Sequence, residues 1–385
     1  MKILLLGASG SIGKQTLDVL KRNPNDFVLT GFSVGLKTRY ISQILKNFPT
    51  VTDICLRDKS KISYYQNKYP HINFYFGDEG LNSLIDHCDY DMAVNALVGF
   101  VGLTPSIKIL ERNKKLALAN KESLVVGGEL INNLLKEGKG QLYPIDSEHV
   151  ALSKCLKVDS KNVDKLIITA SGGSFRNLSR EQLKNVTKDD ALKHPTWKMG
   201  QKITIDSATM VNKCFEIIEA HYLFNYPRTK IDVLLHDESH IHSLVKYKDG
   251  TYRADISKPD MRNPIKYALY ETNIDFKTYV SDDYRKFGQY HFHEFDLKRY
   301  PIIKWADKVI RDKGTFGAVL NASNEVAVHA FLNNEIDFLT IERIINELMK
   351  KHQNISHPNL SQLIEVDQST RETAKQLTKK WRKNK

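Results

Sequence analysis

The sequence predicts an α/β protein with a doubly wound parallel sheet at the N-terminus, a central α+β part and a small helical C-terminal part. From the N-terminus onward, short apolar runs alternate with apolar residues at helical spacing, which is the order that parallel strands joined by helices produce. Near residue 146 the pattern changes to mixed strands and helices, and amphipathic segments close the chain. The length of 385 residues suits two or three domains.

Strands of the N-terminal sheet are expected at 2–6, 27–34, 52–56, 73–76, 92–96, 115–119 and 141–145. The central part is expected to form strands at 166–169, 202–205, 233–235, 242–246 and 252–256. Apolar residues at helical spacing predict helices at 316–332, 340–349 and 362–381. One more amphipathic helix is expected over 207–216, with Val211, Cys214 and Phe215 on its buried face.

Composition and charge exclude several classes of protein. No run approaches the roughly 20 apolar residues that span a bilayer, and a signal-peptide pattern is absent, so we expect a cytoplasmic protein with no membrane partner. The four cysteines are widely spaced, which predicts buried, reduced thiols. The net charge of +12 raises the question of nucleic acid. Residues 371–385 hold half of that surplus, so a solvated basic tail and no nucleic-acid partner are expected.

A glycine-rich loop, Gly7-Ala8-Ser9-Gly10-Ser11-Ile12-Gly13, stands between the first strand and the first helix. Glycines permit the tight turn, and the helix N-terminus that follows attracts a pyrophosphate. The loop therefore predicts a Rossmann-like dinucleotide site. A tight turn without a ligand is the alternative.

The end of the second strand indicates which nicotinamide cofactor is used. It carries Ser33, Lys37 and Arg39 and no acidic residue. An acidic residue at this place holds the ribose of NAD, whereas cations and small donors suit the 2′-phosphate of NADP. NADPH is therefore favoured over NADH, and an ordinary exposed loop is the alternative.

Two carboxylates, Asp146 and Glu148, follow the apolar run that ends at Ile145. In an extended chain, side chains two residues apart point to one side, so both could hold one cation. Oxygen ligands suit Mg²⁺ or Mn²⁺. The alternative is that Asp146 caps a helix.

A polar set in the central part could serve a metal and a phosphate together. Asn212 and Glu216 stand four residues apart on one helix, with Lys213 beside them. The alternative is a surface ion pair on a solvated helix. Trp197 lies in a polar segment that could close over a substrate as a lid, or it could be a buried core residue.

Nine ordered motifs between residues 7 and 328 resemble the 1-deoxy-D-xylulose 5-phosphate reductoisomerase family. They are GASGSIGKQTLDV, NALVGFVGL, LALANKESLV, PIDSEHVA, ASGGSFR, HPTWKMG, KITIDSATMVNK, KPDMRNPI and LNASNEVAV. The resemblance implies rearrangement of 1-deoxy-D-xylulose 5-phosphate, by a retro-aldol/aldol route or an α-ketol shift, and its reduction by NADPH to 2-C-methyl-D-erythritol 4-phosphate. It also implies one divalent cation (Mg²⁺, Mn²⁺ or Co²⁺), a sugar phosphate substrate and a homodimer.

The expected domains are an NADPH-binding domain at 1–145 and a catalytic domain at 146–272 with a lid at about 171–200. A connector at 273–300 and a helical domain at 301–385 follow.

The resemblance also assigns roles to single residues. It implies three metal ligands: Asp146, Glu148 and Glu216. The residues implied in substrate binding or catalysis are Lys121, Ser147, Glu148, Ser171, His194, Ser207, Asn212, Lys213 and Glu216, with Trp197 and Met199 in the lid. The residues implied to bind the cofactor are Ser9, Gly10, Ser11, Ile12, Gly35, Lys37, Asn120, Glu122 and Gly200. His242 stands where the family also has a histidine, either behind the site or as an acid–base group.

Two other functions remain open. One is an NADPH-dependent reductase that performs no rearrangement, which a metal requirement for turnover would separate from the first hypothesis. The other is an NADPH-sensing or nucleic-acid-binding protein without turnover, motivated by the charge of +12.

Overall fold

The computed structural model describes residues 1–197, 199–271 and 288–382. These residues form two compact units. The first unit comprises 1–120, 131–146 and 260–271, and the second comprises 121–130, 147–259 and 288–382. The four-part division of the sequence stays a prediction, and residues 273–287 of the expected connector lie outside the described residues.

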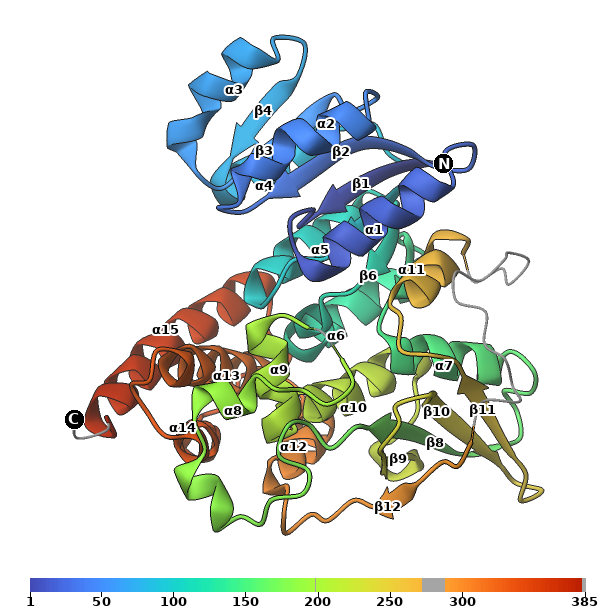
Figure 1. Cartoon of the computed structure of the whole chain (residues 1–385), viewed down its shortest axis with the longest axis vertical. Helices are drawn as coiled ribbons and strands as arrows, with labels where there is room; N and C mark the ends of the chain where they lie inside the picture. The colour runs from blue at the N-terminus through green and yellow to red at the C-terminus, as the bar shows by residue number, and fades with distance from the viewer. Residues whose placement is uncertain (198, 272–287, 383–385) are drawn as a thin grey trace. The chain divides into compact units, whose positions relative to one another are not determined.

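A seven-stranded sheet with parallel strand pairs forms the first unit (Figure 1). Its order is β4-β3-β2-β1-β5-β6-β7. The strands are β1 (Lys2–Leu6), β2 (Val28–Val34), β3 (Asp53–Leu56), β4 (Asn73–Phe76), β5 (Met92–Asn95), β6 (Lys115–Leu118) and β7 (Gln141–Pro144). The seven strands expected here are confirmed, with ends that differ by at most one residue.

The helices of the first unit cover this sheet, which is why its strands are apolar runs rather than alternating patterns. Ile3, Leu4 and Leu5 of β1 are fully buried. The helices are α1 (Ser11–Arg22), α2 (Ile41–Asn47), α3 (Ile62–Lys68), α4 (Gly77–His87), α5 (Leu103–Glu111) and α11 (Arg262–Leu269). Because β1 lies between β2 and β5, the strand order reverses there, and open α/β sheets bind ligands at such a point.

The second unit contains a five-stranded sheet in the order β11-β10-β8-β9-β12. Its strands are β8 (Val163–Ala170), β9 (Ile231–His236), β10 (Ile241–Tyr247), β11 (Tyr252–Ile256) and β12 (Phe292–Glu294). Strands β8 and β9 are parallel, and the other pairs are antiparallel. The strands expected near 166, 233, 242 and 252 are confirmed, and β12 was not expected.

The strand expected at 202–205 is wrong, because these residues belong to helix α9 (Gln201–Thr209). The sequence Lys-Ile-Thr-Ile alternates polar and apolar residues as a strand does. The helical conformation is favoured over a strand because it buries Thr204, Ile205 and Ala208 on one side. At the start of the helix, the Thr204 N–H donates to the Gly200 carbonyl. Tertiary burial overrides local β-propensity here.

The second unit also contains helices, and those of its C-terminal part are drawn in orange and red (Figure 1). The helices of this unit are α7 (Ser147–Leu156), α8 (Lys188–Ala191), α9, α10 (Val211–Phe224), α12 (Lys304–Asp312), α13 (Phe316–Leu332), α14 (Phe338–Lys351) and α15 (Leu360–Lys380). Helix α6 (Lys121–Lys136) contributes 121–130 to the second unit and the rest to the first. The three expected C-terminal helices are confirmed.

The single helix expected over 207–216 is interrupted at Met210, whose φ of 64° separates α9 from α10. Buried positions for Val211, Cys214 and Phe215 are confirmed. The interruption places Ser207 on α9 and starts a new helix at Val211.

The structure bears on three expectations that came from composition, which concern the cysteines, membrane-spanning helices and the basic tail. The four cysteines are buried and free, as predicted. Among the described residues, no helix combines the length and the apolar character that crossing a membrane demands. A fully solvated basic tail is wrong for Arg371, because its guanidinium bonds Asp367 and Glu325 at a half-buried position. Residues 383–385 of that tail lie outside the described residues.

Candidate active site

The loop between β1 and α1 is shaped by its glycines. Gly7 has φ +87°, and a Cβ there would lie 2.6 Å from the Ala96 carbonyl oxygen. A Cβ on Gly13 would lie 2.3 Å from the Gly7 carbonyl oxygen. Helix α1 begins with no acidic residue in its first turn and no side-chain cap, so its N-terminus suits an anion. The residues predicted to bind the pyrophosphate make this turn: Ser9, Gly10, Ser11 and Ile12.

At the end of β2, Ser33 is buried, whereas the basic residues that follow it are exposed. Ser33 is not part of an exposed loop, because it is buried and its hydroxyl accepts the Gly7 N–H over 2.9 Å. Lys37 and Arg39 are exposed. The Arg39 guanidinium lies 5.3 Å from the ring centroid of Tyr40. Lys14 of α1 donates to the Tyr40 hydroxyl over 3.1 Å, which adds a third cation that the sequence pattern did not single out.

Asn120 is fully buried in the first unit. Its side-chain amide donates to the carbonyl oxygens of Leu97 and Gly99, each over 3.0 Å. The amide therefore holds the turn after β5, and a Cβ on Gly102 would lie 2.3 Å from the Asn120 Oδ1. The predicted contact of Asn120 with the nicotinamide is not tested by these bonds.

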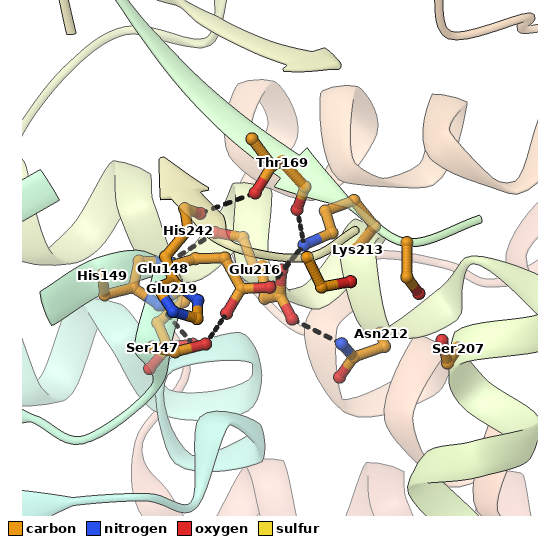
Figure 2. A network of polar contacts seen from close by, with 12 residues as sticks. Ser147, Glu148, His149, Thr169, Ser207, Asn212, Lys213, Glu216, Glu219 and His242 are labelled. Atoms are coloured by element: carbon orange, nitrogen blue, oxygen red, sulfur yellow. Dashed lines mark hydrogen bonds and ion pairs between the residues drawn. The ribbon is translucent and has the colours of Figure 1, made fainter. Parts of the chain in front are cut away.

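Three charged side chains meet inside the second unit, Glu148 from α7 and Lys213 and Glu216 from α10 (Figure 2). The Lys213 ammonium donates to Glu148 Oε1 over 2.9 Å and to Glu216 Oε2. It also donates to the Thr169 carbonyl oxygen over 2.5 Å. Glu148 and Glu216 each bring a carboxylate oxygen within 4.8 Å of the other. Two of the three carboxylates that the resemblance implies as metal ligands, Glu148 and Glu216, are thus brought together around one ammonium group.

Two further predicted residues join this cluster. The Lys121 ammonium donates to Asn212 Oδ1 over 2.7 Å and to Glu216 Oε1 over 3.1 Å. The Asn212 amide donates to the same oxygen of Glu216. Lys121 comes from the start of α6, so residues 95 positions apart in sequence meet at one carboxylate.

The charges of the cluster stabilise one another. Burial by itself would raise the pKa of the Glu148 carboxyl, but the ammonium groups of Lys213 and Lys121 lower it well below its ordinary value. Burial would lower the pKa of Lys213, but Glu148 and Glu216 raise it above its ordinary value. The side chains of Lys213 and Glu216 are 5% and 1% exposed. A surface ion pair on a solvated helix is therefore the wrong interpretation of these two residues.

The convergence of Asp146 and Glu148 was expected from an extended chain, and this reason is wrong. Strand β7 ends at Pro144, and α7 begins at Ser147, so Asp146 and Glu148 do not share a strand. Asp146 directly precedes α7 in the chain. Within α7, the Ser147 hydroxyl donates to Glu148 Oε2 over 2.6 Å, which orients the carboxylate of Glu148.

A second polar group joins His194, Ser171 and Ser207. The Nε2 atom of His194 lies 3.1 Å from the Ser171 hydroxyl and 3.3 Å from the Ser207 hydroxyl. The Nδ1 atom accepts the backbone N–H of Thr196 and Trp197, so it carries no proton. In the neutral ring the proton therefore resides on Nε2, which donates toward the hydroxyls.

The surroundings keep His194 neutral. Burial, with a contribution from the Arg176 guanidinium, lowers the pKa of His194 to about 4. The loop that carries Ser171 turns through Gly172 and Gly173, both with positive φ. A Cβ on Gly173 would lie 2.7 Å from the Ser207 carbonyl oxygen. Only glycine permits the close approach of this loop to α9.

The predicted lid residues lie just before α9. Trp197 is half-buried, and its ring centroid lies 6.1 Å from that of His242. Its side chain is therefore neither fully buried in the core nor fully exposed. Met199 is half-buried, and Lys198 of the same motif lies outside the described residues.

His242 is buried behind the cluster (Figure 2). Its Nε2 atom lies 3.1 Å from both the carbonyl and the hydroxyl oxygen of Ser257. Burial lowers the pKa of His242, although Glu148 acts in the opposite direction. Its backbone carbonyl accepts the Thr169 hydroxyl. The imidazole of His242 therefore bonds Ser257, whereas only its backbone contacts Thr169.

Sequence reasoning missed Lys202 and Thr169. Lys202 bonds Glu122, a predicted cofactor residue, over 2.9 Å. Thr169 holds Lys213 through its carbonyl, which no side-chain pattern reveals. The approach of Lys202 to Glu122 spans 80 residues, so only its place as the first residue of the KITIDSATMVNK motif could have drawn attention to it. Gly200, also predicted, is the N-cap of α9.

Three family models match the chain. The 1-deoxy-D-xylulose 5-phosphate reductoisomerase model matches residues 3–128. The model of the C-terminal domain of the same enzyme matches 142–224, and a DXP reductoisomerase C-terminal domain model matches 256–373.

Two named relatives match over nearly the whole chain. A 1-deoxy-D-xylulose 5-phosphate reductoisomerase of Lysinibacillus sphaericus is 44% identical over 381 residues, which is 98% of this chain and 100% of the relative. The Bacillus cereus enzyme of the same name is 43% identical over 372 residues, 96% of this chain and 97% of the relative.

Solved structures agree with these relatives. A DOX-P reductoisomerase in complex with NADPH, fosmidomycin and magnesium has a TM-score of 0.92 and 32% identity, covering 98% of each chain. The Zymomonas mobilis 1-deoxy-D-xylulose 5-phosphate reductoisomerase in complex with NADPH has a TM-score of 0.89 and 34% identity over the same share. The chain belongs to the 1-deoxy-D-xylulose 5-phosphate reductoisomerase family.

Proposed function

We propose that this chain converts 1-deoxy-D-xylulose 5-phosphate to 2-C-methyl-D-erythritol 4-phosphate, with NADPH as reductant and one divalent cation. The observation that carries the proposal is the buried cluster of Glu148, Lys213 and Glu216, with Lys121 and Asn212 beside it. Membership of the family supports it, as do solved relatives described with NADPH and magnesium.

The reaction has two balanced steps. The first rearranges the carbon skeleton without gain or loss of atoms, by a retro-aldol/aldol route or an α-ketol shift, and yields an aldehyde. The second transfers a hydride from NADPH to the aldehyde carbon and a proton to its oxygen. The products are the alcohol and NADP⁺.

The donor set fits a hard divalent cation. Glu148 and Glu216 supply carboxylate oxygens within 4.8 Å of one another, and Asp146, next to α7 in the chain, is the third proposed ligand. Oxygen ligands suit Mg²⁺ and Mn²⁺, and Co²⁺ is the third candidate. When bound, such a cation polarises a carbonyl and stabilises negative charge on oxygen. Ser147 orients the Glu148 carboxylate through its hydroxyl.

The substrate is proposed to lie between this cluster and the His194 group. Lys213, Lys121 and Asn212 carry charge and hydrogen-bonding atoms toward its oxygens. Ser171, Ser207 and the Nε2–H of His194 suit a phosphate, because hydroxyls and a neutral N–H donate to anionic oxygens. A neutral His194 supplies this hydrogen bond without titrating at neutral pH.

The segment before α9 is proposed as the lid. Trp197 and Met199 are half-buried apolar side chains on it, suited to excluding water from the reacting atoms. His242 supports Trp197 from the sheet side by ring contact.

The cofactor is proposed to bind at the carboxyl end of β1. The turn that Gly7 and Gly13 permit fits a pyrophosphate, because a side chain at either position would meet backbone atoms. Gly35 and Lys37 are proposed at the 2′-phosphate, and Asn120 and Glu122 at the nicotinamide.

The proposal includes a homodimer in the cytoplasm that has neither a nucleic-acid nor a membrane partner. Light scattering of the purified protein tests the dimer, and a fluorescent DNA titration at low salt tests the absence of nucleic-acid binding. A monomer, or tight salt-dependent DNA binding, would contradict the respective part of the proposal.

The function is tested by turnover after chelation. Purified protein, 1-deoxy-D-xylulose 5-phosphate and NADPH should show loss of NADPH absorbance only when Mg²⁺ or Mn²⁺ is restored, with 2-C-methyl-D-erythritol 4-phosphate as the product by NMR. Fosmidomycin, present in a solved relative, should inhibit it. NADPH oxidation that yields an unrearranged alcohol would instead favour a simple reductase. No oxidation with any metal would contradict the proposed substrate.

A further inference from the structure

A buried ion-pair group in the second unit joins Glu122, proposed at the nicotinamide, to Lys202 and Asp206, which have no role in the proposed function. The Lys202 ammonium, from the first turn of α9, donates to Glu122 Oε1 and to Asp206 Oδ2, each over 2.9 Å. The three side chains are 12%, 8% and 4% exposed, respectively. One cation thus bridges two carboxylates at a place that water barely reaches.

The group is closed on its other side. Asp206 Oδ1 accepts the side-chain amide of Asn324, from α13, over 2.8 Å, and Asn324 is fully buried. The Lys202 ammonium also lies 5.7 Å from the ring centroid of Phe215 on α10. Residues of helices α6, α9, α10 and α13 therefore meet around Lys202 and Asp206.

Electrostatics favour the pairing of Lys202 with Glu122. Burial would lower the pKa of Lys202, but Asp206, Glu122 and Glu325 raise it above its ordinary value. Burial would raise the pKa of Glu122, but Lys202 lowers it. A buried carboxylate without its cation is strongly disfavoured, so the positions of Glu122 and Lys202 depend on each other.

Glu122 and Lys121 are consecutive residues in the first turn of α6. Side chains of consecutive helical residues point about 100° apart, and these two enter neighbouring polar clusters. Glu122 meets Lys202, while Lys121 meets Asn212 and Glu216. A contact that holds Glu122 in the first turn of α6 therefore also sets the direction in which the Lys121 side chain points.

We propose that Lys202 is a positioning residue, which fixes the start of α6 against the start of α9 and thereby holds Lys121 at Asn212 and Glu216. The effect on catalysis rests on the proposed function, since that assigns Lys121 to the substrate. Lys202 stands two residues after Gly200, the N-cap of α9. The same contact therefore also anchors the C-terminal end of the segment that carries Trp197 and Met199.

The first test compares Lys202→Met and Lys202→Arg with wild type. Misplacing a group by about 1 Å can reduce a rate about 100-fold, so Lys202→Met should lower kcat by about that factor. The NADPH dissociation constant should rise as well, because Lys202 also holds Glu122, which is proposed at the nicotinamide. Lys202→Arg retains the charge and should recover part of kcat. Wild-type kcat in Lys202→Met would overturn the inference.

A double variant separates positioning from stability and covers the case in which Lys202→Met does not fold. In Glu122→Gln/Lys202→Met the buried negative charge of Glu122 is removed together with the positive charge of Lys202, so the melting temperature should recover relative to Lys202→Met. The kcat should stay below that of Glu122→Gln alone, which carries the same change at the proposed nicotinamide residue but keeps Lys202 in contact with it. If kcat recovered together with the melting temperature, Lys202 would act through stability alone and the inference would be wrong.

Arg262→Met is the matched control. Arg262 also bridges two carboxylates, bonding Asp260 over 3.0 Å and Asp18 over 3.1 Å, and all three residues belong to the first unit. It should lower the melting temperature and leave kcat unchanged. An equal loss of kcat in Arg262→Met would show a general response to destabilisation and would overturn the inference.

Hydrogen exchange gives a readout that needs no turnover. The amides of the first turns of α6 and α9 should exchange faster in Lys202→Met than in wild type, while the amides of α15 should not. A wild-type protein without turnover would contradict the proposed function but not this structural result. Unchanged exchange at α6 would contradict the inference even in an active enzyme.

Discussion

The two proposed binding regions differ in what forms them, which is the backbone in one region and side chains in the other. The loop at the end of β1 is shaped by backbone, since side chains on Gly7 or Gly13 would collide with neighbouring carbonyl oxygens. The cluster in the second unit consists of side chains, in which Lys213 joins Glu148 and Glu216 away from water. A backbone site follows from a local pattern of glycines, whereas a side-chain site depends on contacts between distant segments. Added side-chain atoms should therefore disrupt the glycine loop, and loss of a charged group should disrupt the cluster.

The largest effect should come from Glu216→Gln, which removes a charge from the cluster. Loss of one preorganised electrostatic partner commonly lowers a rate about 100- to 1,000-fold, and kcat should fall by at least the smaller factor. Steady-state kinetics measure it, and NADPH binding by fluorescence is the control, expected to be unchanged. A variant with wild-type kcat would remove Glu216 from the proposed ligands.

Gly13→Ala should damage the backbone region in turn. A Cβ there would lie 2.3 Å from the Gly7 carbonyl oxygen and 2.7 Å from Ala8 Cα, and overpacking of this kind costs about 1–3 kcal/mol. NADPH affinity and melting temperature should both fall, as titration and thermal denaturation would measure. Cation binding to the second unit should persist. Unaltered NADPH affinity would remove the loop from the cofactor site.

His194→Gln should change how stability depends on pH. The pKa of His194 is lowered to about 4 in the folded chain, against about 6.5 when unfolded. Between these values the unfolded chain binds a proton that the folded one does not, so stability is present above pH 6.5 and is lost as the pH falls toward 4. One such proton contributes a slope of at most about 1.4 kcal/mol per pH unit.

Denaturation at several pH values checks this result. The wild-type midpoint should fall more steeply from pH 6.5 to 4 than that of His194→Gln, and the variant should also show a higher KM for the sugar phosphate. Parallel curves for the two proteins would contradict a neutral, buried His194.

The smallest effect is expected at the exposed end of β2. Lys37 and Arg39 are exposed, and exposed charge pairs contribute up to about 1 kcal/mol. The double variant Lys37→Ala/Arg39→Ala should therefore reduce the preference for NADPH over NADH about fivefold, measured as the ratio of the two kcat/KM values. An unchanged ratio would place the 2′-phosphate elsewhere.

Much of the first unit could be predicted because its signals are local. Apolar runs bounded by turns marked all seven strands, since buried parallel strands need no partner information to be recognised. The glycine loop was equally visible. The strand expected at 202–205 failed because its alternating pattern also suits one side of α9, and only tertiary burial decides between the two.

The site in the second unit could be predicted by residue type but not by geometry. Glu148, Lys213 and Glu216 were singled out, yet the extended-chain reason for Asp146 and Glu148 was wrong, because α7 begins between them. Lys202 was missed since its partner Glu122 stands 80 residues away. The pair of Lys213 and Glu216, which the segment alone suggests as a surface ion pair, is buried at the centre of the cluster. Burial is a property of the fold and cannot be read from the segment.

Calorimetric titration of Mn²⁺ into the wild-type chain and Glu216→Gln tests most directly whether the carboxylates of the second unit hold a cation. NADPH is titrated into the same samples as a check on the first unit. Wild type should bind Mn²⁺ and Glu216→Gln should lose that binding, while both bind NADPH equally. Equal Mn²⁺ affinity in the two proteins would contradict the assignment of the cluster as the metal site.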